Sequence, residues 1–216
     1  MIRLTHRFVG LILLLGVLIA PMHSRVAAQR AQRPNTRVVD WSSAPAILAR
    51  IKAPKFPARD FEITRFGAVA DGQSDSTDAI RKAIDTCHNA GGGRVVVPAG
   101  TFITGAVHLK SNVNLYLSAG AILKFSTNPQ KYLPVVYTRF EGTECMNYSP
   151  LIYAFEQENI AVTGSGTLDG SASDQNWWAW TRRRGNDEAP ARSSVRKLLD
   201  YGERGVPVKD RIFGKG

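Results

Sequence analysis

Short runs of strand composition follow one another from Arg94 onward, with no helical segment between them. Gly, Asn, Ser and Pro separate the runs, as is typical of turns between strands. A doubly wound parallel sheet needs a helix after each strand, so the pattern argues against it and favours an all-β fold. The expected strands are residues 94–97, 101–104, 106–109, 113–117, 121–125, 151–154 and 160–163.

Two of these runs resemble each other at an offset of 47 residues. SNVNLYLSAGAIL and ENIAVTGSGTLDG align with Asn112 over Asn159 and Ala121 over Leu168. The offset is about two coils of a stacked β repeat. It predicts a solenoid of parallel coils, with like side chains stacked inward and Asn or Gly at the corners. A β-sandwich also explains the strands, but it does not explain the repeat.

One helix is predicted before the strands, in DSTDAIRKAIDTCHNAGGG. Asp75 or Ser76 can cap its start, and Gly91 can end it. Five small or apolar residues fall on one face at helical spacing: Ala79, Ile80, Ala83, Ile84 and Cys87. Since terminal repeats of a solenoid need a cap, we expect this face to cover the open first coil.

The glycines of the second run do not form a cofactor loop. Gly164, Gly166 and Gly170 are spaced G-x-G-x-x-x-G, one residue longer than the dinucleotide fingerprint. That fingerprint also requires an apolar helix to follow, whereas SASDQNWWAW follows here. No cofactor is expected.

The net charge of +10 is concentrated at the two ends of the chain. Residues 1–59 carry a net +9, residues 60–180 a net −4 and residues 181–216 a net +5. A nucleic-acid-binding module would place its positive charge on the folded surface, so no nucleic-acid partner is expected.

The first 28 residues have the organisation of a signal peptide. A basic start precedes an apolar run from Phe8 to Ala20, and Val26-Ala27-Ala28 forms a small-residue cleavage site. A retained N-terminal anchor is the alternative. The prediction is a secreted or periplasmic protein without a membrane anchor after cleavage. Residues 29–59 then form a basic, Pro-rich segment.

Cysteines and histidines offer little chemistry. Cys87 and Cys145 form either one disulfide or two free buried thiols. The four histidines are scattered, and none belongs to a metal-binding cluster, so no metal site is predicted.

Several motifs resemble those of the pectate-lyase-like right-handed β-helix superfamily, and their combination resembles glycoside hydrolase family 28, the polygalacturonases. The motifs are 66–68 (FGA), 71–72 (DG), 76–80 (STDAI), 91–100 (GGGRVVVPAG), 104–113 (TGAVHLKSNV), 132–134 (YLP), 141–142 (EG), 159–170 (NIAVTGSGTLDG) and 177–178 (WW). The resemblance covers residues 60–216. It implies a right-handed parallel β-helix with an N-terminal capping helix, of which residues 60–216 are the N-terminal portion and residues 181–216 an incomplete surface excursion.

The resemblance also implies a function. Family members hydrolyse α-galacturonosidic bonds of pectin with inversion, using aspartates of an Asn-Thr-Asp motif and an Asp-Asp pair. Neither motif occurs here, nor does the family's Gly-His-Gly, and Arg50-Ile51-Lys52 lies before the β-helix in the wrong order. We therefore expect a glycosidase chain truncated after Gly216, inactive by itself and without catalytic residues. A non-catalytic β-helix fragment that binds acidic polysaccharide, or a pectate lyase on the same scaffold, are the alternatives.

Two tryptophans are the candidate substrate-binding residues. Trp177 and Trp178 can stack on sugar rings, or they can pin a loop by packing. Asp169 and Asp174 are expected to form turns. Arg182-Arg183-Arg184 can attract an anionic chain or form a solvated surface. The expected partner is acidic pectic polysaccharide, and the complete protein is expected to be a monomer.

Overall fold

The computed structural model describes residues 41–181 and 191–214. The predicted signal peptide and the first part of the basic segment lie outside these residues. The chain divides into two units, Met1–Lys52 and Ala53–Gly216. In the described part of the first unit, a 3-10 turn, η2 (Trp41–Ser43), leads into the short helix α1 (Ala44–Leu48).

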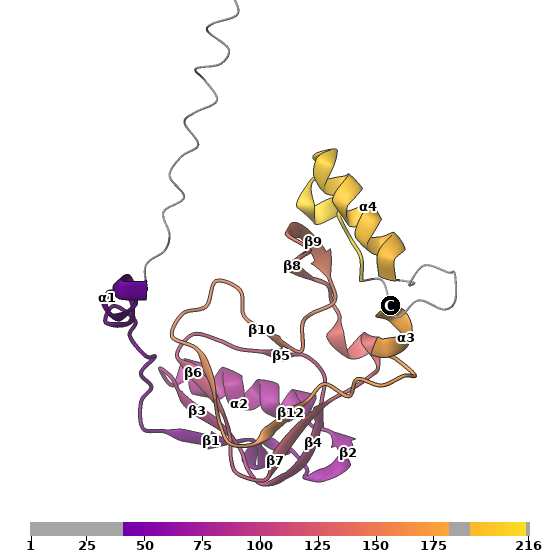
Figure 1. Ribbon diagram of the computed structural model, residues 1–216. Coiled ribbons are helices and arrows are strands. Elements are labelled where there is room, and N and C mark those ends of the chain that lie inside the picture. Colours follow the sequence, from indigo (N-terminus) through magenta and orange to yellow (C-terminus); the bar gives the residue numbers. More distant parts are fainter. Residues whose placement is uncertain (1–40, 182–190, 215–216) are drawn as a thin grey trace, which may run out of the picture. The chain divides into compact units, whose positions relative to one another are not determined.

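Three parallel sheets run along the second unit (Figure 1). The first contains, in spatial order, β1 (Asp60–Glu62), β3 (Gly93–Val97), β6 (Val113–Leu117) and β11 (Ala161–Gly164). The second contains β2 (Asp71–Asp75), β4 (Gly100–Thr104), β7 (Ala121–Phe125) and β12 (Thr167–Asp169). The third pairs β5 (Val107–His108) with β10 (Ile152–Tyr153). Each coil adds one strand to the first two sheets, so the architecture is the expected parallel β-helix.

The core lies between the sheets, where alternate side chains point inward. Along β3 and β7 the buried residues alternate with less buried ones, which is the period of a strand with one face in the core. Val95 and Leu115 stack in register in the first sheet, as do Phe102 and Leu123 in the second, and all four are fully buried. The alternation in the sequence therefore decides which side of each strand builds the core.

The predicted capping helix is α2 (Thr77–Asn89). Its five buried residues are the five expected ones, and it packs against β1, β3 and the 3-10 turn η3 (Ile63–Phe66). Of the two candidate caps, Asp75 makes the contact. Its Oδ1 accepts a hydrogen bond from the Thr77 N–H at 2.9 Å, whereas the Ser76 side chain makes no capping bond.

The spacing of 47 residues corresponds to one coil, so the expectation of two coils is wrong. β11 pairs directly with β6, with Val162 opposite Leu115. An undecorated coil is much shorter, because Gly93 pairs with Val113 only 20 residues later. The longer coil carries an excursion that contains the 3-10 turn η4 (Pro129–Tyr132) and the antiparallel hairpin of β8 (Val136–Phe140) and β9 (Thr143–Asn147).

The sequence alignment also slips by two residues at the second corner. Leu168 pairs with Leu123 and not with Ala121. Four residues, Ser118 to Ala121, separate the paired positions Leu117 and Ile122, whereas only Ser165 and Gly166 separate their partners Gly164 and Thr167. Because the shorter corner shifts the next strand, one constant offset cannot describe both sheets. The Asn pair is aligned correctly, since Asn159 Nδ2 donates to Asn112 Oδ1 at 2.9 Å.

Several elements are not expected from the sequence. They are β2, β12, the β8–β9 hairpin, α3 (Trp177–Thr181), α4 (Ala191–Glu203) and the 3-10 turn η5 (Val208–Asp210). β2 has the composition of a turn, DGQSD, and is a strand because β4 lies beside it. The hairpin turns at Glu141 and Gly142, both with positive φ, which two-residue hairpin loops require.

Cys87 and Cys145 are both free and buried, so of the two predicted alternatives the structure has two thiols and not a disulfide. Within residues 41–181 and 191–214, no helix is long and apolar enough to cross a bilayer.

Candidate functional site

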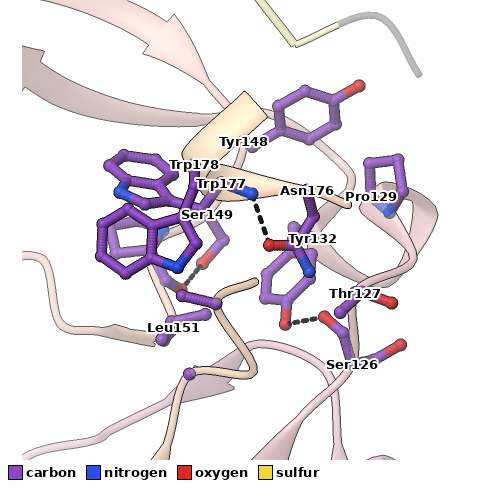
Figure 2. Close-up of a pocket in the computed structure, with 13 residues that line it drawn as sticks. Ser126, Thr127, Pro129, Tyr132, Tyr148, Ser149, Leu151, Asn176, Trp177 and Trp178 are labelled. Carbon is purple, nitrogen blue, oxygen red and sulfur yellow. Dashed lines mark hydrogen bonds between the residues drawn. The ribbon is translucent and has the colours of Figure 1, made fainter. Parts of the chain in front are cut away.

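A pocket of about 600 Å³ lies beside the long excursion of the third coil (Figure 2). Three segments that are distant in the sequence line it: the end of the second sheet with η4, the segment that follows β9, and the stretch from the corner after β12 to the start of α3. The lining residues are Ser126, Thr127, Pro129, Tyr132, Tyr148, Ser149, Pro150, Leu151, Gly170, Ala172, Asn176, Trp177 and Trp178. Its volume is in the range of small-molecule sites.

Trp177 and Trp178, the two predicted substrate-binding residues, both line this pocket. They remain 49% and 39% exposed, so neither is a fully packed core residue. Asn176 fixes the preceding loop, because its Oδ1 accepts from the Ser173 N–H at 2.7 Å and its Nδ2 donates to Ser171 O at 2.9 Å. The side-chain oxygen of Asn176 also accepts from the Trp177 N–H. This anchored turn presents both indoles at the pocket.

Tyr132 forms a fixed wall opposite the indoles. Its hydroxyl donates to Ser126 O at 2.6 Å, and its own carbonyl accepts from the Ser149 N–H at 2.9 Å. Burial raises the pKa of the Tyr132 phenol to about 12. The hydroxyl therefore stays protonated at neutral pH and keeps its donor bond to Ser126 O. The bond from the Ser149 N–H to the Tyr132 carbonyl joins two segments of the wall.

Ser149 is a buried hydroxyl at the pocket wall. Its Oγ donates to Pro150 O at 2.9 Å and lies 3.0 Å from His108 Nε2. The His108 ring packs against Tyr153, with ring centroids 5.2 Å apart. Partial desolvation lowers the pKa of His108, although the residue as a whole is exposed. His108 contacts the wall through Ser149 and does not itself line the pocket.

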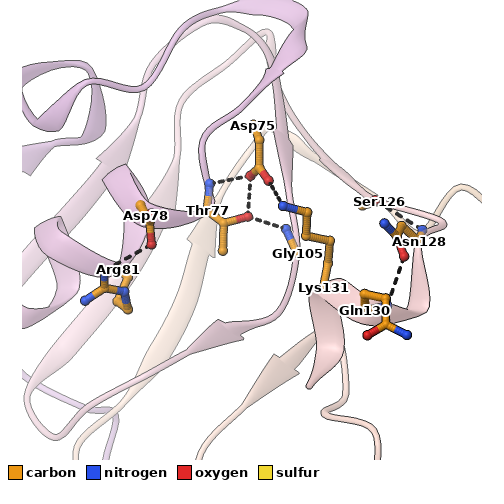
Figure 3. A network of polar contacts seen from close by, with 9 residues as sticks. All are labelled: Asp75, Thr77, Asp78, Arg81, Gly105, Ser126, Asn128, Gln130 and Lys131. Atoms are coloured by element: carbon orange, nitrogen blue, oxygen red, sulfur yellow. Dashed lines mark hydrogen bonds and ion pairs between the residues drawn. The ribbon is translucent and has the colours of Figure 1, made fainter. Parts of the chain in front are cut away.

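A polar network joins η4 to the start of the capping helix (Figure 3). Lys131 Nζ lies 2.5 Å from Asp75 Oδ2, and the Thr77 hydroxyl donates to Asp75 Oδ1 at 2.5 Å. The Thr77 hydroxyl also accepts from the Gly105 N–H at 2.7 Å. Burial acts to raise the pKa of Asp75, but the hydrogen bonds from Lys131 and Thr77 outweigh it and lower the pKa. This network holds the η4 wall of the pocket in place.

Position 105 has no room for a side chain larger than that of glycine. A Cβ at this position would lie 2.7 Å from Lys131 O and 2.8 Å from Lys131 Cβ. The Ala106 N–H donates to the same carbonyl at 3.2 Å. The close approach of the backbone therefore allows η4 to dock against the coil.

Among the described residues, none that lines the pocket is Asp, Glu, Lys, Arg or His. An inverting glycosidase needs two carboxyl groups about 6.5–9.5 Å apart. The pocket is therefore suited to binding and has no groups for acid–base hydrolysis. Nor do the described parts of the chain contain a group of three His, Cys, Asp or Glu residues placed to hold a metal ion.

The two aspartates noted in the sequence do not line the pocket. Asp169 Oδ1 accepts from the Ser171 N–H at 2.8 Å, which is the turn contact expected of it. Arg182, Arg183 and Arg184 lie outside the described residues, as does the side chain of Trp180.

Comparison with known proteins identifies the class. Residues 61–136 match the family model "Rhamnogalacturonase A/epimerase, pectate lyase-like". The stacked coils and the capping helix form a right-handed parallel β-helix, and residues 61–136 within it are similar to this pectate-lyase-like family model.

The resemblance to polygalacturonases is also confirmed. The chain is 44% identical to a hyperthermoactive exopolygalacturonase from Thermotoga maritima, with a TM-score of 0.76 over 81% of this chain and 40% of that one. It is 38% identical to an exo-poly-alpha-D-galacturonosidase from Dickeya chrysanthemi, over 50% of this chain and 19% of that protein. It is 44% identical to alginate lyase 7 from Azotobacter vinelandii, over 51% of this chain and 14% of that protein. The chain thus spans less than half of each of these relatives.

Sequence reasoning missed most of the lining. In the sequence, Tyr132 stands out only as part of a family motif, and Tyr148 and Ser149 lie in the sequon Asn147-Tyr148-Ser149. Tyr148 and Ser149, just before Pro150, belong to no periodic pattern that would indicate a binding site. Only the folded excursion brings residues near 130 and 150 to the tryptophans.

Proposed function

We propose that the protein is a polygalacturonase-type glycosidase that hydrolyses α-galacturonosidic bonds of pectic polysaccharide. The supporting observation is the similarity to the Thermotoga maritima exopolygalacturonase, which extends over 81% of this chain. Further support comes from the pocket, where two partly exposed indoles face hydroxyl and amide groups. Aromatic faces suit the apolar faces of sugar rings, so Trp177 and Trp178 bind substrate in this proposal.

The pocket supplies binding and not the acid or base. Hydrolysis with inversion needs one carboxylic acid to protonate the leaving oxygen and one carboxylate to activate water. Neither group is present in the lining. The reacting carboxylates of the proposed hydrolase therefore lie outside this pocket, which holds a neighbouring sugar unit of the same polymer.

Export and a monomeric state belong to the same proposal. The basic start, apolar run and small-residue cleavage site of residues 1–28 support secretion or delivery to the periplasm. Such a location gives access to polymeric pectin. No membrane anchor is needed once residues 1–28 are removed.

The intact natural protein tests the function directly. We expect it to release reducing ends from polygalacturonate, and NMR of the first products should show the anomeric proton with inverted configuration. Failure to release reducing ends or unsaturated ends from polygalacturonate would refute enzymatic cleavage and leave a non-catalytic polysaccharide-binding protein.

A lyase is the second candidate. The 44% identity to alginate lyase 7 supports it over 51% of this chain. Lyase products carry a double bond at the new non-reducing end, which their ultraviolet absorbance reveals. Ultraviolet-absorbing products and a requirement for calcium would show that the protein cleaves its substrate by elimination and not by hydrolysis.

A further inference from the structure

The described residues that line the pocket of Trp177 and Trp178 carry no formal charge at neutral pH. They supply hydroxyls, one amide, prolines and aromatic rings, and burial keeps the Tyr132 phenol protonated. A carboxylate is bound most strongly where a cation pairs with it, and none of these residues is a cation.

Lys131, which is next to the lining residue Tyr132 in the sequence, forms an ion pair outside the pocket. Lys131 belongs to η4, which forms one wall, but Lys131 does not line the pocket. Its ammonium lies 2.5 Å from Asp75 Oδ2 (Figure 3). Gly105 and the Lys131 carbonyl fix the backbone at this point. A carboxylate in the pocket would therefore lose water without gaining a counter-charge from any described lining residue, which is unfavourable.

We propose that this pocket binds a methyl-esterified galacturonosyl unit and discriminates against the free acid. The inference rests on the proposed function and specifies the form of pectin that the site recognises. The ester removes the charge and adds a methyl group that can contact an indole. The ring hydroxyls can meet the polar groups of the lining in Figure 2. Charge complementarity thus favours the neutral unit.

The test compares two small probes that differ only in the ester. Titration of the intact protein with methyl α-D-galacturonoside and with its methyl ester, followed by NMR, gives both dissociation constants. We expect the ester to bind about tenfold more tightly through the pocket. Its affinity should not change with salt, because screening acts on charged pairs.

Variants separate the pocket from any other site on the protein. Trp177→Ala and Trp178→Ala should each weaken ester binding by about tenfold and leave binding of the free acid unchanged. Trp41→Ala is the matched control, because Trp41 is 86% exposed and belongs to the other unit. Circular dichroism checks that each variant is folded.

A charge-introducing variant keeps the test independent of the indoles. Thr127 is an exposed lining residue, so Thr127→Lys should raise affinity for the free acid and make it salt-dependent. Thr86→Lys adds the same charge on an exposed position of α2 that does not line the pocket, and it should change neither constant.

The outcomes distinguish this inference from the function on which it rests. If the free acid binds as tightly as the ester, or if the tryptophan variants bind both probes normally, the inference is overturned while hydrolysis of polygalacturonate stands. If neither probe binds but polygalacturonate is cleaved, another part of the protein covers the pocket and the inference also fails. If nothing binds and nothing is cleaved, the proposed function fails with it.

Discussion

The carboxylate of Asp75 illustrates how one residue joins two parts of the molecule. It accepts from the first N–H of α2 and pairs with Lys131 of η4. It lies two residues before the helix, in a strand of turn-like composition. Sequence patterns identify it as a possible cap, but its bond to Lys131 depends on a separation of 56 residues along the chain.

Replacement of Asp75 should destabilise the protein. Asp75→Ala removes the acceptor for the Thr77 N–H, and loss of such a capping contact costs about 1 kcal/mol of the free energy of unfolding. Urea melts at neutral pH measure the change. Asp78→Ala is the control, since Asp78 lies in the first turn of α2 with a side chain 80% exposed, and its ion pair contributes less than about 0.5 kcal/mol.

The pH dependence of that difference follows from the lowered pKa of Asp75. A carboxyl group with a lower pKa in the folded state stabilises it above the unfolded value of 3.8, and this contribution is lost as the pH falls through the folded pKa. The difference between the wild type and Asp75→Ala should therefore be constant from neutral pH to about pH 5 and shrink below pH 3.8. A difference that grows on acidification would contradict the ion pair.

Both thiols should be unreactive in the folded protein. Cys87 and Cys145 are fully buried, and burial raises the pKa of Cys87 to about 11 and also raises that of Cys145. Because the thiolate is the reactive form, a disulfide reagent at pH 8 should label neither cysteine until guanidinium is added. Unfolding should then release two thiols, and one or none would indicate a disulfide.

At the scale of elements, the corner between β11 and β12 depends on a glycine. Gly164 has a φ of +106°, and a Cβ there would overlap the carbonyl oxygen of Leu117. That oxygen accepts from the N–H groups of Ser165 and Gly166 at 3.0 and 3.2 Å. The corner thus closes around one carbonyl of the preceding coil, and the glycine leaves room for it.

Gly164→Ala should be severely destabilising. Backbone strain and overlap together cost about 3 kcal/mol of the free energy of unfolding. Gly142→Ala is a matched control with φ of +79° and no atom within 4 Å of its Cβ, so strain alone should cost about 1 kcal/mol. Thermal melts of both variants measure the two losses of stability. Equal losses would show that steric overlap with Leu117 is unimportant.

At the scale of the whole molecule, the last described coil is less well covered than the coils before it. Val162 and Leu168 are 40% and 43% exposed, whereas their partners Leu115 and Leu123 are fully buried. β11 and β12 also lie at the ends of their sheets. An exposed apolar strand edge is a template for pairing with another chain.

The polypeptide of 216 residues should therefore self-associate in solution. We expect a sedimentation coefficient that rises with concentration, and Val162→Ser with Leu168→Ser should reduce the association. Val69→Ser is a control, because Val69 is 47% exposed outside the sheets. A monomer at every concentration would contradict this prediction.

The same polypeptide should release no reducing ends from polygalacturonate. Its pocket lacks the carboxyl pair that hydrolysis needs, and the Asn-Thr-Asp and Asp-Asp motifs do not occur in it. A reducing-sugar assay with an active polygalacturonase as positive control measures the difference. Hydrolysis by the 216 residues alone would require a catalytic carboxyl pair outside the pocket but within this chain.

The sequence by itself determined the local features of this protein. Helical spacing identified the buried face of α2. Runs of strand composition between Gly, Asn, Ser and Pro located most strands of the coils, because both signals lie within a few residues. The tertiary structure decided what depends on distant neighbours. The stacking of β11 on β6 across one decorated coil and the strands β2 and β12 have no sufficient local signal. The pocket belongs to this second group, since Trp177 and Trp178 became part of a site only when the excursion placed Tyr132 and Ser149 beside them.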